Sequence, residues 1–108
     1  MKRLSEIINI LVNKSEWVDT ETAISFSQAS QTQTNHSQTV TKAGYYPRAI
    51  LDYRFEGSGV GQMVPYAVYM NNRAAGTVKV NAGLRNNNPS STITGTFYVR
   101  ILWQKLGG

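Results

Sequence analysis

From Trp17 onward, apolar and polar side chains alternate along the chain with a period of two, which is the pattern of half-buried β-strands. The alternation is clearest in residues 17–26, 49–55, 64–70, 77–84 and 93–103. Gly, Asn, Pro and Ser are frequent between these runs, and they favour turns. Short strands separated by turns predict a mainly β fold, an antiparallel β-sandwich over residues 16–108.

In each predicted strand, the face with the larger apolar side chains is expected to pack in the core. Core packing is therefore the interpretation for most strand aromatics: Tyr53, Phe55, Tyr66, Phe97 and Trp103. Pro65 indicates that the strand 64–70 lies at a sheet edge or begins irregularly. The glycine-rich segment 57–61 is expected to be a hairpin turn, because it lacks the Gly-Lys-Ser/Thr ending of a phosphate-binding loop.

Residues 27–39 form a polar stretch of Gln, Ser and Thr in which Thr and Gln partly alternate. This pattern predicts an exposed edge strand or an extended loop. His36, the only histidine of the chain, lies in this stretch far from any carboxylate. We expect a surface histidine there, since a catalytic or metal-binding role would need distant partners.

The N-terminal segment, residues 1–15, has a different period. Apolar residues with helical spacing predict a short amphipathic helix over 3–13: Leu4, Ile7, Ile8 and Leu11. About eleven residues form only a marginal helix in isolation. The segment is therefore expected to be a stem or oligomerisation element that packs on its own domain or on copies of itself. It lacks the features of a signal peptide, and no run is long enough to predict a membrane span.

The charges are distributed unevenly. The net charge is +5, yet residues 57–108 contain no Asp or Glu, and the chain has no cysteine. Thiolate sites are thereby excluded, as are carboxylate-based sites in the second half. We therefore expect no enzymatic activity, no metal site and no cofactor. The cations are spread over turns and strands rather than clustered, so nucleic acid is an unlikely partner.

Three segments could bind a ligand. Tyr45 and Tyr46 are adjacent in a Gly-Tyr-Tyr-Pro segment, where one ring of the pair is expected to be exposed. Two predicted loops combine amide groups with an arginine, which suits recognition of sugars or carboxylates. Their candidate ligand-binding residues are Asn71, Asn72 and Arg73 in one loop, and Arg85, Asn86 and Asn87 in the other.

Several of these features together resemble a known group of proteins. The Tyr-Tyr-Pro step into the strand at 45–51, the Asn-rich turns after Met70 and Leu84, and the aromatic–aliphatic strand 96–103 resemble phage tail-fibre tips and the related H-type lectin-like sandwiches. The N-terminal helix is similar to the stalk that precedes such tips. The resemblance implies a trimer, in which Leu4, Ile7, Ile8 and Leu11 would form a three-stranded stem.

The sequence thus predicts a non-enzymatic phage or prophage structural protein, a tail-fibre-like module that attaches to a receptor or carbohydrate. The expected partners are further copies in a homotrimer, a cell-surface glycan or receptor, and other virion proteins. We expect the protein in the cytoplasm during assembly and then in the virion, released without a signal peptide. The alternatives are a small basic nucleic-acid-binding β-barrel and a structural oligomer without a ligand of its own.

Overall fold

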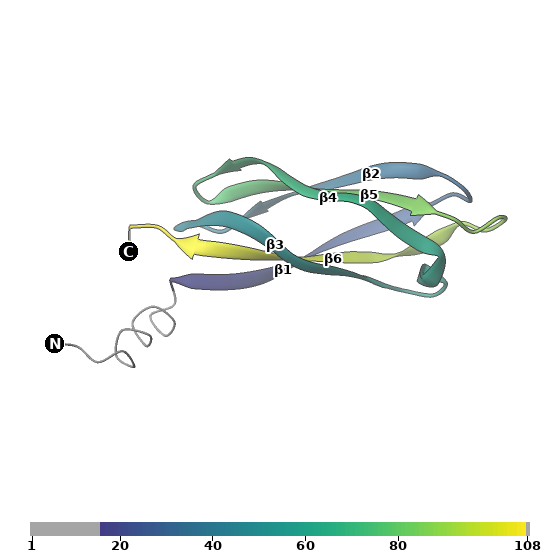
Figure 1. Ribbon diagram of the computed structural model, residues 1–108, viewed down its shortest axis with the longest axis horizontal. Coiled ribbons are helices and arrows are strands. Elements are labelled where there is room, and N and C mark those ends of the chain that lie inside the picture. Colours follow the sequence, from purple (N-terminus) through teal and green to yellow (C-terminus); the bar gives the residue numbers. More distant parts are fainter. Residues whose placement is uncertain (1–15, 108) are drawn as a thin grey trace.

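Residues 16–107, which the computed structural model describes, form two antiparallel three-stranded sheets, seen as two layers in Figure 1. β6 lies between β1 and β3 in one sheet, and β5 lies between β2 and β4 in the other. We call them the β6 sheet and the β5 sheet. In chain order the elements are β1 (Trp17–Gln28), β2 (Gln33–Thr41), β3 (Tyr45–Glu56), η1 (Val60–Gln62), β4 (Met63–Ala74), β5 (Thr77–Asn86) and β6 (Ile93–Lys105). The predicted mainly β fold is confirmed, whereas the helix predicted within residues 1–15 lies outside the described residues.

The two central strands supply most of the core, because each has a hydrogen-bonded neighbour on both sides. Their inward side chains are at most 1% exposed: Val78, Val80, Ala82 and Leu84 on β5, and Phe97, Val99, Ile101 and Trp103 on β6. Ile24 and Phe26 of β1 extend this cluster. The alternation in the sequence therefore identified the inward faces of β1, β5 and β6 correctly.

The glycine-rich segment after β3 is not a hairpin turn, contrary to the prediction. β3 pairs with β6 and β4 pairs with β5, so residues 57–62 carry the chain from one sheet to the other at one end of the sandwich (Figure 1). Gly57 and Gly59 have φ angles of 138° and 76°, which side chains disfavour. The glycines thus permit a crossing between layers.

The edge strands of the two sheets differ in regularity. β1 and β2 pair with their neighbours without interruption. β3 and β4 each contain two register shifts, the first between Pro47 and Ala49 in β3 and between Pro65 and Ala67 in β4. Proline has no N–H to donate to a ladder, so it is tolerated where a bulge interrupts the pairing. Each bulge changes which side chains face the core.

Two of the tyrosines predicted to lie in the core are exposed, for different reasons. Tyr66 is 47% exposed because the bulge in β4 puts its ring on the outer face, against Gly83. Tyr53 is also 47% exposed, but it stands opposite the buried Val99 and its ring centroid lies 5.4 Å from that of Phe97, so it covers the edge of the core. In β3, Ile50 packs against the core while Leu51 is 49% exposed, the reverse of the predicted alternation. An extra residue in a strand reverses the inward and outward positions beyond it, and the second shift in β3, between Ile50 and Asp52, restores them, so that Phe55 packs against the core as predicted. Sequence period alone therefore failed around the bulges and held along the rest of the two strands.

The polar stretch 27–39 contributes the edge strand β2, which confirms the prediction of an extended edge. His36 is not a simple surface residue. Its ring is half-buried, its centroid lies 6.2 Å from that of Phe26, and its Nε2 is 3.0 Å from Oε1 of Gln28. Burial lowers the pKa of His36 from its ordinary value of 6.5, because desolvation penalises the charged ring.

The lowered pKa predicts a pH dependence of stability. The unfolded state binds a proton more readily than the folded state, so His36 contributes stability above pH 6.5 that is lost as the pH falls towards its folded pKa. We expect the urea midpoint to decrease between pH 7 and pH 5. The His36→Gln variant should show a flatter profile over this interval, and an unchanged slope would refute the assignment.

Candidate functional site

The two predicted Arg/Asn loops lie at opposite ends of the sandwich. Ala74 pairs with Thr77 at the start of β5, whereas Arg85 stands near the end of that strand. The eight steps along the strand from Thr77 to Arg85 span roughly 26 Å at the rise of a β-strand. The structure therefore separates the predicted ligand-binding residues into two groups. Most of the first predicted loop belongs to β4, where Asn72 takes a left-handed φ of 53° at a register shift.

Near the first group, the two adjacent tyrosines point to different sides of β3. Tyr45 packs against the core and Tyr46 pairs opposite Gln104. The guanidinium of Arg48 lies 4.5 Å above the Tyr46 ring, and Arg73 donates a hydrogen bond to the backbone oxygen of Arg48 at 3.2 Å. Both tyrosines are half-buried, so neither forms an open stacking platform.

In the second group, Asn86 is a structural residue. Its side chain is 0% exposed, and its Nδ2 donates to the backbone oxygens of Gln28 and Ser91 at 2.9 and 3.0 Å. Its Oδ1 accepts a hydrogen bond from the backbone N–H of Asn88 at 2.8 Å. The prediction that Asn86 contacts a ligand is therefore wrong, because the whole amide is buried and hydrogen-bonded. Arg85 and Asn87 remain accessible, and they bond to each other at 2.7 Å.

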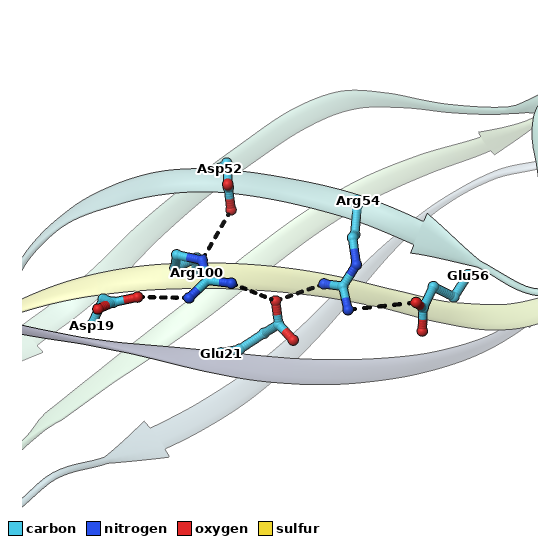
Figure 2. A network of polar contacts seen from close by, with 6 residues as sticks. All are labelled: Asp19, Glu21, Asp52, Arg54, Glu56 and Arg100. Carbon is cyan, nitrogen blue, oxygen red and sulfur yellow. Dashed lines mark hydrogen bonds and ion pairs between the residues drawn. The ribbon is translucent and has the colours of Figure 1, made fainter.

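The outer face of the β6 sheet carries a network of charges that joins its three strands (Figure 2). Arg100, in the centre, contacts Asp19 at 2.6 Å, Glu21 at 3.3 Å and Asp52 at 3.5 Å. Arg54 contacts Glu21 at 2.6 Å and Glu56 at 3.5 Å. Four carboxylates thus surround two guanidinium groups, an arrangement that sequence analysis did not foresee.

The pairing of β1 and β3 with β6 brings these groups together. The hydrogen bond to Glu21 raises the pKa of Arg54, and the hydrogen bond to Asp19 raises that of Arg100, so both arginines stay charged. The groups are solvent-exposed, so solvent screens each pair and its contribution to stability is small. We interpret the network as a set of ion pairs that links the three strands of the β6 sheet. A shallow depression beside it is lined by residues 25–27 and 94–96, which include no titratable side chain.

The outer face of the β5 sheet has a different character, because it combines exposed aromatic rings with amides. Tyr66 and Tyr69 of β4 are 47% and 46% exposed. Residues three apart in a regular strand face opposite sides, but the bulge between Pro65 and Ala67 puts both rings on the outer face. We call this surface the tyrosine–amide face; its exposed residues are Asn35, Tyr66, Tyr69 and Asn71, and the buried Asn81 lies beneath the two exposed amides.

Gly83 leaves the space in which the Tyr66 ring lies. A side chain on Gly83 would lie 2.6 Å from Cε2 and Cζ of Tyr66, so the ring rests directly on the backbone of β5. Beside it, Asn81 links the three strands. Its Nδ2 donates to Oδ1 of Asn71 at 2.9 Å, and its Oδ1 accepts a long bond of 3.5 Å from Nδ2 of Asn35.

Chemically, this face offers two flat apolar rings next to the exposed amides of Asn35 and Asn71, which the buried Asn81 holds in place. Amides bond to hydroxyl groups, and tyrosine rings cover apolar surfaces at little cost in side-chain entropy. Asn71 is the one residue of the face that the sequence had suggested. Pro65 was the available signal for Tyr66 and Tyr69, because a proline inside a strand indicates a bulge and hence a change of phase.

Comparison of the chain with protein-family models, curated proteins and solved structures found no match. Within residues 16–107, the structure contains no helix that is both long and apolar enough to span a membrane. In the same region, no group of three or more His, Asp or Glu side chains is arranged to hold a metal ion. The site must therefore be interpreted from its own chemistry.

Proposed function

We propose that the protein is a non-enzymatic attachment module, of the phage tail-fibre tip or H-type lectin-like kind, that binds carbohydrate through the tyrosine–amide face. The observation that carries the proposal is the bulge in β4, which places Tyr66 and Tyr69 on the same outer face. Large exposed rings beside amide groups are the usual means by which proteins recognise ligands that have both apolar and hydroxyl-bearing surfaces.

Removal of either ring should weaken binding. We expect Tyr66→Ala and Tyr69→Ala each to lower the affinity for a bound glycan by about tenfold, because an anchoring aromatic residue contributes on the order of 1–2 kcal/mol. The ligand is selected on an array of neutral and acidic glycans, and the affinity is then measured by titration calorimetry. Gly83→Ala should also weaken binding, because the new methyl group displaces the Tyr66 ring.

The matched control is Trp17→Ala, which removes an aromatic residue of similar exposure (45%) from the other sheet. Its affinity should equal that of the wild type. Loss of binding in Trp17→Ala but not in the tyrosine variants would place the site elsewhere, and no binding to any glycan on the array would refute the proposed function.

The assembly part of the proposal is a homotrimer, which rests on the resemblance and on the spacing of Leu4, Ile7, Ile8 and Leu11. Three copies would present three faces at once, so that weak single sites add up to useful avidity. Light scattering of the full chain should give three times the mass of 12.0 kDa. A monomer at micromolar concentration would exclude the trimer.

A further inference from the structure

We propose that the glycan bound by the tyrosine–amide face is a linear acidic polysaccharide whose carboxylates contact Lys79 and Arg85. This inference rests on the proposed function and names the class of its ligand. It starts from the distribution of charge between the two sheets. Asp19, Glu21, Asp52 and Glu56 all belong to the strands of the β6 sheet, whereas β2, β4 and β5 contain no acidic residue.

The two cations lie at opposite ends of the tyrosine–amide face. Lys79 is in register with Thr39 and Asn71, and Arg85 with Gln33 and Val64. Both side chains are on the outer side of β5, because the residues next to them in the strand, Val80 and Leu84, face the core. They are six positions apart, which is about 20 Å along a strand.

Asn81 and Gly83 lie between these cations on the same side of β5. Asn81 carries the amide contacts to Asn35 and Asn71, and Gly83 supports the Tyr66 ring. A ligand that contacts both cations would therefore pass over the amides and beside the rings. An extended chain of several sugar units satisfies this geometry, and a single monosaccharide does not.

The state of the two cations also favours an anionic ligand. Among residues 16–107, no ion pair includes Lys79 or Arg85, whereas both arginines of the β6 sheet network are neutralised by carboxylates. Nε of Arg85 donates to Oδ1 of Asn87 at 2.7 Å, which orients the planar guanidinium. Its terminal nitrogens can then bind a carboxylate with two parallel hydrogen bonds.

A carbohydrate fits this face better than a nucleic acid does. A duplex carries one negative charge for about every 1.7 Å of its axis, so two cations about 20 Å apart neutralise few phosphates. A polysaccharide presents hydroxyl groups between more widely spaced charges, and the exposed amides of Asn35 and Asn71 can bond to hydroxyl groups.

The test compares polygalacturonate oligosaccharides with the same oligosaccharides after complete methyl esterification, which removes the charge and keeps the sugar chain. We expect the acidic form to bind at least tenfold more tightly, with an affinity that falls as salt is added. Lys79→Gln and Arg85→Gln should each weaken binding of the acidic form by about fivefold and leave binding of the ester unchanged. Lys105→Gln, an equal change of charge on the other sheet, is the control and should have no effect.

Each possible result of these measurements supports or overturns the acidic ligand. Equal binding of both forms, or an array on which only neutral glycans bind, overturns the acidic ligand and leaves the proposed function standing. Absence of binding to these oligosaccharides and to the whole array overturns both. Single-stranded DNA that binds more tightly than polygalacturonate, and loses affinity in Lys79→Gln and Arg85→Gln, would replace the polysaccharide by a nucleic acid.

Discussion

Trp103→Ala should destabilise the protein by about 3–5 kcal/mol, the largest effect that we expect of any single substitution. The Trp103 side chain is 0% exposed and is the largest of the fully buried side chains. It lies on the central strand β6, in register with Val18 on one side and Pro47 on the other. Its Nε1 donates a hydrogen bond to Oγ1 of Thr20 at 2.7 Å. The substitution thus leaves a cavity and removes a partner of Thr20.

The free energy of unfolding is measured by urea titration with circular dichroism as the signal. Trp103→Phe keeps much of the apolar volume and loses the hydrogen bond, so it should cost less, about 1–2 kcal/mol. Leu102→Ala, next to it on the outer side of β6, should change stability by about 1 kcal/mol or less, since it opens no cavity. A Trp103→Ala variant as stable as Leu102→Ala would show that the side chain is not an anchor of the core.

Asn86→Ala should destabilise the protein by about 2–4 kcal/mol, because three hydrogen bonds, one buried and two partly buried, disappear and their partners lose their contacts. The amide of Asn86 joins Gln28 at the end of β1 to Ser91 and Asn88 in the loop that leads to β6. Gln28 in turn donates to the backbone oxygens of Thr32 and Leu84 at 2.6 and 2.7 Å. Removal of Asn86 therefore loosens one whole end of the sandwich.

The neighbouring Asn87 provides the matched control. Its side chain is exposed and bonds only to Arg85 among the described residues, so Asn87→Ala should change stability by less than about 0.5 kcal/mol. Urea midpoints of the two variants, measured at the same pH, separate a structural amide from a surface one. Equal midpoints would contradict the structural role of Asn86.

The strands could be predicted from the sequence wherever the pairing is regular. In β1, β5 and β6 the inward residues follow the alternation without interruption, because an unbroken ladder keeps the period of two. In β3 and β4 no single period describes the whole strand, because each bulge adds a residue that has no partner. Leu51 and Tyr66 are exposed for this reason, whereas Phe55, Val68 and Met70 pack against the core where the alternation placed them. The pattern of side chains does not state where that extra residue is placed.

Prediction of the tyrosine–amide face would have required the position of the bulge in β4 and also the order of the strands in the sheet. Tyr69 and Asn81 come together only because β4 pairs with β5, which the turn between them suggested. Asn35 joins them from β2, an edge strand whose neighbour the sequence did not reveal. The ion-pair network likewise depends on strand order, since Asp19 and Asp52 contact Arg100 only because β6 lies between β1 and β3.

The insertion of β6 between β1 and β3 has a consequence for synthesis of the chain on the ribosome. Trp17 pairs with Gln104 and Tyr45 with Lys105, so neither β1 nor β3 can form its pairing in this sheet until β6 has been synthesised. The β5 sheet can pair earlier, since all its strands precede β6. Pairing between such distant residues is slow, because a long loop must close before any contact forms. We therefore expect a nascent chain stalled before β6 to hold at most one of the two sheets, and to be readily cleaved by proteases within β1 and β3.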